Sequence, residues 1–590
     1  MTIASNTLTN NRLEWQSLLP NTTPYEALFA TAAQLAPVPF AAYQPRLENG
    51  LTLFCHPQSK PRFMLIKAQE SGEYLALLDR AVKELQAEET PALTGGDYLV
   101  HGHHVRWQAA QHGDEPFAAK VTCLYQEWVE PEQLFGCVRI HKETVSLQPG
   151  LVHQANGGVL ILSVRSLLAQ PLMWLRLKQM ITQQRFDWLS PDETRPLPLH
   201  IPSMPLDLRL VLVGDRLGLG DFHDMEPELG ELAIYGEFEA ELPLLDEEGM
   251  ALWCGYINGL VQQNNLPPLS TDAWPVLLKQ AIRYSGDQGS LPLCPQWLAR
   301  QLAEAAMYTQ QNEITADSLE AALNNRDWRH NYLAERMQDE IELGQIMIET
   351  EGAVVGQING LSVLEYPGHP RAFGEPARIS CVAHIGDGEF VDVERKAELG
   401  GNLHAKGMMI MQAFLNAELE LDQPMPLSAS IVFEQSYGEV DGDSASLAEL
   451  CALISALSQQ PINQQIAVTG SVDQFGHVQP IGGVNEKIEG FFEVCQRRGL
   501  TGTQGVILPS TNVRHLCLHP SVIDAVQNGQ FHLWAVDSVI EALPLLTGLP
   551  YADEQQPSLL GIIQERIAQM NPQDRRRPWP LRWLNWFNQG

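Results

Sequence analysis

Two segments decide the fold: FEQSYGEVDGDSAS at residues 433–446 and IAVTGSVDQFGHVQPIGGVNEKIEG at residues 466–490. The first segment brings Ser444 to the start of a predicted helix, whose apolar residues recur at helical spacing. These residues are Leu447, Leu450, Cys451, Ile454 and Leu457. The second segment carries Lys487 on another predicted helix, which follows the turn at Gly482-Gly483. The two helices therefore each present one chemically active side chain near their start.

Ser444 and Lys487 are residue types that fit nucleophilic catalysis. A serine hydroxyl is a poor nucleophile until a base removes its proton. A lysine can be that base if burial keeps part of it neutral, and apolar residues flank Lys487 (Ile488, Phe491 and Phe492). Gly442 allows the tight turn that presents the serine, and N–H groups at the helix start would stabilise an oxyanion. We interpret the pair as the nucleophile and general base of a serine–lysine peptidase.

The same residues also have structural interpretations. A serine at a helix start is most often only a cap, and a lysine on a helix is usually solvated. Ser446 and Glu449 have the spacing of a capping box at the same helix start. The two residues by themselves therefore leave a purely structural role open.

Length and charge limit the remaining possibilities. A chain of 590 residues is expected to form about three to five domains. The net charge of −33 argues against a general nucleic-acid binder, because phosphate contacts need a basic surface. We expect a cytoplasmic protein, since the sequence shows no signal peptide, no membrane span and no Cys-x-x-Cys pair among its nine cysteines.

An apolar strand, a short turn and a helix are predicted from Pro61 to Leu85, the arrangement in which a phosphate-binding loop would lie. Such a loop needs glycines, a lysine on the phosphates and a Ser or Thr on magnesium. Gly72 is present, but Glu73 stands at the lysine position and Tyr74 at the hydroxyl position. The sequence therefore predicts a loop that repels a triphosphate.

The segment that follows resembles an AAA+ module. The strand at 159–162 is similar to the second nucleotide motif of that family, but Ser163 and Val164 occupy the places of its two acids. Gly214-Asp215 lies where the family carries a polar sensor, and Gly230 and Leu232 lie where it carries arginine fingers. The resemblance implies an AAA+ fold that has lost ATP chemistry. No cofactor is expected, and ATP binding is disfavoured by Glu73, Ser163 and Val164.

The stretch from Phe433 to Gly499 resembles the proteolytic domain of the Lon family, in the B/C-type branch with the motif "GDSAS". The resemblance assigns Ser444 and Lys487 as catalytic residues and Thr469 as a supporting residue. Asp443 stands beside the nucleophile as in that branch, where it would hold Lys487 or close the site at rest. Glu365 matches an acid of other members only weakly.

The resemblance implies an α/β multidomain chain: a degenerate AAA+ α/β core with a helical lid, followed by a Lon-type α+β proteolytic domain. The predicted boundaries are an N-terminal segment at 1–55, an AAA+-like domain at 56–244, a lid at 245–345, the proteolytic domain at 346–550 and a tail at 551–590. The implied assembly is a homo-hexamer. The implied activity is cleavage of unfolded polypeptides without ATP hydrolysis. A conventional ATP-dependent Lon protease and a non-catalytic adaptor or holdase ring remain alternatives.

Two further features allow more than one interpretation. His101-Gly102-His103-His104 is the single histidine cluster, and strand alternation would place His101 and His103 on one face as a metal pair or as ordinary polar side chains. The tail at 574–590 is rich in Arg and Trp at helical spacing. It would contact a membrane surface or an acidic partner, or dock on the chain's own protease domain.

Overall fold

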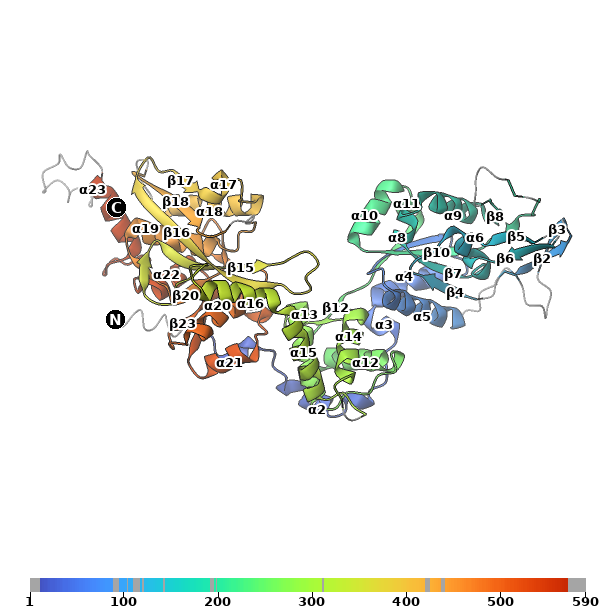
Figure 1. The fold of residues 1–590 in the computed structure, drawn as a ribbon, viewed down its shortest axis with the longest axis horizontal. Helices are drawn as coiled ribbons and strands as arrows, with labels where there is room; N and C mark the ends of the chain where they lie inside the picture. The colour runs from blue at the N-terminus through green and yellow to red at the C-terminus, as the bar shows by residue number, and fades with distance from the viewer. Residues whose placement is uncertain are drawn as a thin grey trace. The chain divides into compact units, whose positions relative to one another are not determined.

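The computed structural model describes residues 11–88, 95–102, 104–109, 117–118, 121–141, 144–190, 196–197, 199–309, 312–419, 425–436 and 441–570. They form two compact units (Figure 1). The C-terminal unit contains the chain up to Glu26, the insertion Trp274–Leu291 and the residues from Glu320 onward. The N-terminal unit contains Ala27–Ala273 and Pro292–Leu319. The Arg/Trp-rich tail at 574–590 lies outside the described residues.

The N-terminal unit is built on a five-stranded parallel sheet, in the order β11-β1-β10-β7-β4. Its strands are β1 (Phe63–Lys67), β4 (Cys123–Gln126), β7 (Val159–Ser163), β10 (Arg209–Gly214) and β11 (Ala233–Glu237). All five residues of β7 are buried, as expected for an apolar run in a sheet covered on both faces. The predicted strand–turn–helix is confirmed, because α5 (Gly72–Glu88) follows β1. This is the parallel α/β architecture of an AAA-like domain.

Helices accompany this sheet in the same unit. Trp253 and Leu260 lie buried on α12 (Glu247–Gln263), which packs against α14 (Pro295–Ala306). The histidine cluster lies elsewhere, at the tip of the hairpin β2 (Gly96–His101) and β3 (His104–Ala109). The predicted single strand through this cluster is wrong, because Gly102 turns the chain with a φ of +60°. His101 and His104 are exposed, and His103 lies outside the described residues.

The C-terminal unit is α+β and contains a seven-stranded mixed sheet in the order β17-β18-β16-β15-β20-β23-β24. The strands are β15 (Gln357–Leu364), β16 (Phe373–Ile385), β17 (Phe390–Asp392), β18 (Leu427–Phe433), β20 (Ile466–Val468), β23 (Gln504–Pro509) and β24 (Phe531–Val536). The β15–β16 hairpin is antiparallel, whereas β15, β20, β23 and β24 pair in parallel.

The helix that follows Ser444 and the helix that carries Lys487 cover opposite faces of this sheet. Strand residues alternate between two cores: Val468 of β20 packs in the core of α19 (Ser446–Ser458), and Ala467 packs in the core of α20 (Val484–Arg498). The predicted helix after Ser444 is confirmed, and all thirteen residues of α19 are buried. The helix α18 (Asn402–Leu419) packs in the same core as α19, where its residues Met408, Met411 and Phe414 are buried.

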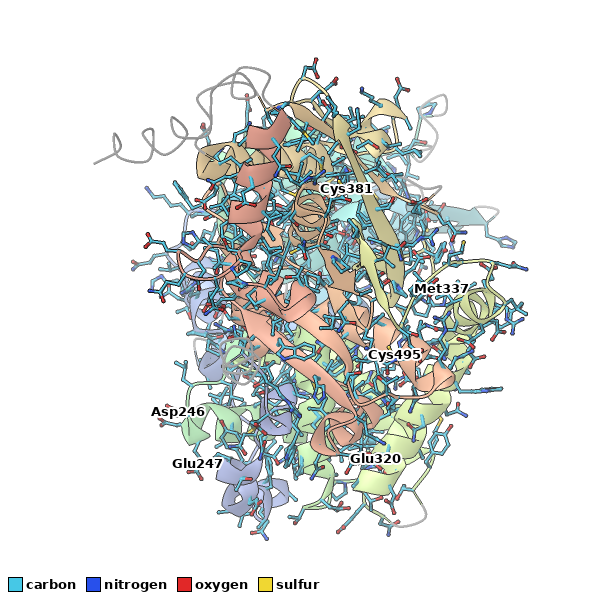
Figure 2. The ribbon with its side chains drawn as sticks, turned by 90° about the vertical axis from the view of Figure 1, so that its left-hand side faces the viewer. Asp246, Glu247, Glu320, Met337, Cys381 and Cys495 are labelled. Atoms are coloured by element: carbon cyan, nitrogen blue, oxygen red, sulfur yellow. The ribbon has the colours of Figure 1, made fainter. Side chains whose placement is uncertain are left out.

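The cysteines are free thiols, seven of them buried. Figure 2 labels Cys381 on β16 and Cys495 on α20. Burial raises the pKa of each of these two thiols to about 12, so they stay protonated and are poor nucleophiles. Within the described residues, no helix has the length and apolar character needed to cross a bilayer.

Candidate active site

Ser444, Thr469 and Lys487 meet at the end of β20. Lys487 Nζ donates a hydrogen bond to Ser444 Oγ at 2.9 Å and lies 3.5 Å from Thr469 Oγ1. Thr469 follows the last residue of β20, and its hydroxyl donates to the carbonyl oxygen of Ser444 at 3.4 Å. Lys487 is 3% exposed and Thr469 is fully buried, whereas Ser444 is half-buried. The structure thus brings together the three residues expected from the sequence, with the serine as the accessible member.

The turn before α19 holds Ser444 in place through the main chain. Gly470 N donates to the Ser444 carbonyl at 2.9 Å, and Leu447 N donates to the Gly470 carbonyl at 3.1 Å. Gly442 has a φ of +129°, which only glycine adopts without strain. This position therefore needs the glycine that the sequence provides.

The predicted capping box at this helix start is wrong. Ala445 occupies the N-cap position and offers no side-chain cap. Ser446 Oγ instead accepts from Val472 N at 3.0 Å, which ties α19 to the strand that follows Thr469. Glu449 does not reach back to the helix start, because its carboxylate is buried beside His404. The spacing of Ser446 and Glu449 fits a capping box, but both side chains make tertiary contacts instead.

Burial lowers the pKa of Lys487 to about 8, and the negative charge of Asp443 opposes that shift. A substantial fraction of the amine is therefore neutral near neutral pH and able to accept a proton. Since the Lys487 amine is engaged with Ser444 and Thr469, Asp443 acts on it through charge and does not close the site in this structure.

An ion-pair cluster fixes the helix that carries Lys487. Arg283, from the insertion Trp274–Leu291, donates to Glu486 Oε1 at 2.7 Å and to Glu489 Oε1 and Oε2 at 2.7 and 2.9 Å. Burial works to raise the pKa of Glu489, but the paired guanidinium holds it below its ordinary value. Because these acids flank Lys487 in sequence, Arg283 anchors the first turns of α20.

Glu365, the weakly matched acid, is exposed just beyond the end of β15. Within the described residues, no hydrogen bond or ion pair joins it to Ser444 or Lys487. The structure therefore leaves it outside the serine–lysine pair.

The loop between β1 and α5 contains an acid that sequence inspection missed. Glu70 is buried, and its Oε2 accepts from the Ser163 hydroxyl and, at 2.8 Å, from Arg165 N. Glu73, in contrast, is exposed on the first turn of α5, and Tyr74 packs its ring 4.9 Å from that of Phe238. The buried carboxylate of this loop is therefore that of Glu70, and it is turned toward the end of β7.

The other residues expected around a nucleotide have structural roles. Ser163 ends β7, Val164 is fully buried, and Asp215 caps α10 (Arg216–Met225) by accepting from Gly218 N at 2.7 Å. The exposed Gly230 has no side chain to offer, and Leu232 is 54% exposed. These residues do not fit a magnesium–nucleotide complex, which needs a cation on the phosphates and acids on the metal.

A second group escaped the sequence analysis: Asp392, Glu394, His404 and Glu449, which are buried together in the C-terminal unit. The available signal was the Asp-x-Glu pair at a strand end in GEFVDVER, followed by the histidine of GGNLHAKG. Their proximity depends on packing between α18 and α19 and is not visible from spacing alone.

Comparisons with known proteins agree with this architecture. Residues 122–236 match the family described as the LonB-like AAA domain, and residues 434–545 match the Lon protease (S16) C-terminal proteolytic domain. A Lon protease homolog of Escherichia coli (strain K12) is 56% identical over 98% of this chain and 100% of its own length. One from Haemophilus influenzae is 41% identical over 96% and 95%.

More distant similarity extends to archaea. An archaeal Lon protease of Pyrococcus abyssi is 25% identical over 65% of this chain and 37% of its own length. The two near-full-length relatives carry the assignment, and the matched S16 domain contains Ser444, Thr469 and Lys487. The chain belongs to the Lon protease family and carries its serine protease domain.

Proposed function

We propose that this chain is an endopeptidase that cleaves unfolded polypeptides, with Ser444 as nucleophile and Lys487 as general base, and without ATP hydrolysis. The observation that carries the proposal is the 2.9 Å hydrogen bond between Lys487 Nζ and Ser444 Oγ. A base within hydrogen-bond reach of a hydroxyl is the geometric requirement for an activated serine.

The reaction follows from this geometry. Neutral Lys487 removes the Ser444 proton as Oγ attacks the peptide carbonyl carbon. The resulting ammonium then protonates the leaving amine, which gives an acyl-enzyme. Water deprotonated by Lys487 attacks the ester and releases the second product. Thr469 positions the amine between two hydroxyls throughout.

Glu70 supports the ATP-independent part of the proposal. A triphosphate at the loop after β1 would meet the buried Glu70 carboxylate in that loop, and Glu73 stands where a lysine is required. Like charges in a partly buried site repel strongly, so nucleotide binding there is unfavourable. Without a motor to unfold substrates, the enzyme would act on chains that are already unfolded.

We also infer a homo-oligomer, a hexamer by analogy with the family. Several large apolar side chains of the C-terminal unit are more than half exposed: Val382, Ile385, Leu403 and Met409. Exposed apolar side chains such as these are available for subunit contacts. Light scattering of the purified chain tests the inferred ring size.

The decisive experiment measures cleavage of fluorescein-labelled casein by the full chain, with and without Mg-ATP, beside Ser444→Ala. Ser436→Ala is the matched control, because it removes a hydroxyl from the same segment outside the catalytic group. We expect equal cleavage with and without nucleotide, loss of cleavage in Ser444→Ala and normal cleavage in Ser436→Ala.

Two results would favour the alternatives. Cleavage that requires ATP hydrolysis identifies a conventional ATP-dependent Lon protease, despite Glu70. Absence of cleavage, together with substrate binding that Ser444→Ala leaves unchanged, identifies an adaptor or holdase.

A further inference from the structure

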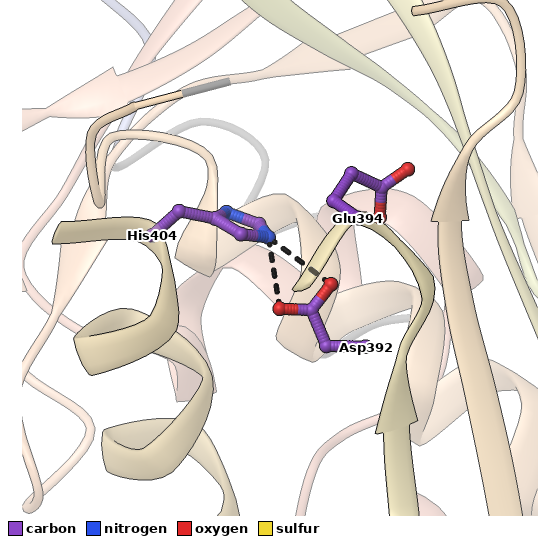
Figure 3. Close-up of side chains that lie close together, drawn as sticks. All are labelled: Asp392, Glu394 and His404. Atoms are coloured by element: carbon purple, nitrogen blue, oxygen red, sulfur yellow. Dashed lines mark hydrogen bonds and ion pairs between the residues drawn. The ribbon is translucent and has the colours of Figure 1, made fainter. Parts of the chain in front are cut away.

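Three carboxylates and one imidazole are buried together in the C-terminal unit, separate from the serine–lysine pair. Asp392 ends β17, Glu394 lies on α17 (Val393–Lys396), His404 lies on α18 and Glu449 on α19. Their exposed fractions are 7%, 4%, 1% and 2% respectively. Figure 3 shows that the His404 ring points at the Asp392 carboxylate, with Glu394 beside it.

A main-chain N–H anchors one oxygen of Asp392 and one oxygen of Glu394. Asp392 Oδ1 accepts from Arg395 N and from His404 Nε2, both at 3.3 Å, and Oδ2 lies 3.2 Å from the same Nε2 atom. Glu394 Oε1 accepts from Phe433 N at 2.8 Å, and Oε2 has no hydrogen-bond partner. One donor atom from each of Asp392, Glu394 and His404 falls within 4.8 Å of the others.

This arrangement leaves negative charge buried without enough donors. Unpaired carboxylate oxygens are costly away from water and are normally paired or bound to a metal. A single imidazole cannot neutralise Asp392, Glu394 and Glu449 together. Either a cation or added protons must complete the cluster.

We propose that Asp392, Glu394 and His404 Nε2 bind one divalent transition-metal cation. Two carboxylate oxygens and one imidazole nitrogen suit Zn²⁺ or Mn²⁺, whereas Mg²⁺ and Ca²⁺ prefer oxygen ligands alone. Glu449 supplies independent support. Its Oε1, which has no hydrogen-bond partner, lies 3.8 Å from His404 Nδ1 on the other side of the ring. A carboxylate in that place orients metal-ligating histidines by accepting the second ring N–H.

The site would be structural and would act on the catalytic loop from a distance. A bound cation would join β17, α17 and α18, with Glu449 of α19 held through the histidine. The neighbouring turn of α18 already holds the loop, because Leu403 N donates to Asp441 Oδ1 at 3.2 Å. Asp441 lies three residues before Ser444. Metal binding would therefore stiffen the segment that presents the nucleophile.

The first test measures metal binding directly. The full chain is stripped with a chelator and titrated with Mn²⁺ and with Zn²⁺, and bound metal is counted by mass spectrometry after dialysis. We expect one equivalent in the wild type and a loss of affinity of at least about 100-fold in Asp392→Asn/Glu394→Gln. The matched control is Asp473→Asn, which alters a half-buried carboxylate 3.0 Å from His477 Nδ1, outside the cluster, and should leave binding unchanged.

A second measurement identifies the ligand and does not depend on the double variant folding. Pulsed electron paramagnetic resonance of bound Mn²⁺ should show coupling to one imidazole ¹⁴N, which His404→Gln abolishes. Saturating Mn²⁺ should also raise the Tm of the wild type and of Asp473→Asn. Wild-type protein that binds no stoichiometric metal, or bound Mn²⁺ without ¹⁴N coupling, overturns the proposal. So does binding that Asp392→Asn/Glu394→Gln leaves intact. Shared protons would then complete the cluster.

Discussion

Ser444 Oγ and Lys487 Nζ lie 2.9 Å apart, although 43 residues separate them and their helices cover opposite faces of one sheet. They meet because both helices begin near the end of β20, where Thr469 extends the strand between them. The sheet therefore sets the distance between the two groups. A small change in the packing of either helix should therefore lower the activity while the protein still folds.

The pH dependence of kcat/KM should report the buried amine. Because burial lowers the Lys487 pKa to about 8, the neutral base increases about tenfold per pH unit below that value and levels off above it. Measurements of kcat/KM for cleavage of an unstructured fluorogenic peptide, made from pH 6 to pH 10, test this expectation. A profile whose midpoint lies near the ordinary lysine value of 10.5 would contradict the proposed role.

Asp443→Asn should move that midpoint to lower pH. The Asp443 charge favours the ammonium form of Lys487, so its removal lowers the amine pKa further. We expect the shift to be small, since Asp443 is partly solvated and its charge is screened. An unchanged midpoint in the same peptide assay would show that Asp443 does not act on the base.

Lys487→Met should stabilise the protein while removing its activity. The folded state binds fewer protons than the unfolded chain between about pH 8 and 10.5, so the free energy of unfolding of the wild type rises across that window. The burial cost is complete below about pH 8 and absent above 10.5. We therefore expect Lys487→Met to add up to about 3 kcal/mol at pH 7 and little at high pH, measured by urea unfolding. If the wild type were instead more stable than Lys487→Met at pH 7, burial of the charged Lys487 amine would not be costly.

The sequence predicted the site better than the surroundings that tune it. Ser444, Thr469 and Lys487 belong to one continuous motif, and the structure brings all three together. Ser446 and Glu449 also matched the capping-box pattern. In the structure, however, Ser446 bonds to a neighbouring strand and Glu449 lies beside His404. A capping motif predicts only local hydrogen bonds, and tertiary contacts override it.

The same limit applies to the nucleotide site. Substitution at Glu73 correctly indicated a missing phosphate lysine, but the acid that points inward is Glu70. Which side of a helix start faces the sheet depends on the turn before it, and a three-residue offset cannot be resolved from composition. The His101–His104 hairpin was mistaken for one strand for a similar reason, because a single glycine decided the turn.

Thr469→Val should reduce kcat with little change in KM. The variant keeps the shape of the side chain but loses the hydroxyl that contacts Lys487 Nζ and the Ser444 carbonyl. Misplacement of a base by a fraction of an ångström costs on the order of 10- to 100-fold in rate. Thr469→Ser keeps the hydroxyl and should retain most activity. Equal kcat in Thr469→Val and the wild type, from peptide kinetics, would remove Thr469 from the site.

Arg283→Met should destabilise the C-terminal unit and lower activity together. It leaves Glu486 and Glu489 unpaired on the helix that carries Lys487, and unpaired, partly buried carboxylates are costly. Because these side chains remain about one-fifth to one-quarter exposed, we expect a loss of about 1–3 kcal/mol. Urea unfolding and peptide cleavage measure the two effects on the same preparation.

Arg514→Met is the matched control for that variant. Arg514 pairs with Asp287 of the same insertion at 2.5 Å, but its side chain is 63% exposed, and within the described residues no ion pair joins it to α20. An exposed pair contributes roughly 0–1 kcal/mol, so this variant should keep nearly full stability and activity. If Arg283→Met behaved like Arg514→Met in both assays, the guanidinium would not be what holds the first turns of α20. The position of Lys487 would then depend on the apolar packing of Ile488 and Phe491 alone.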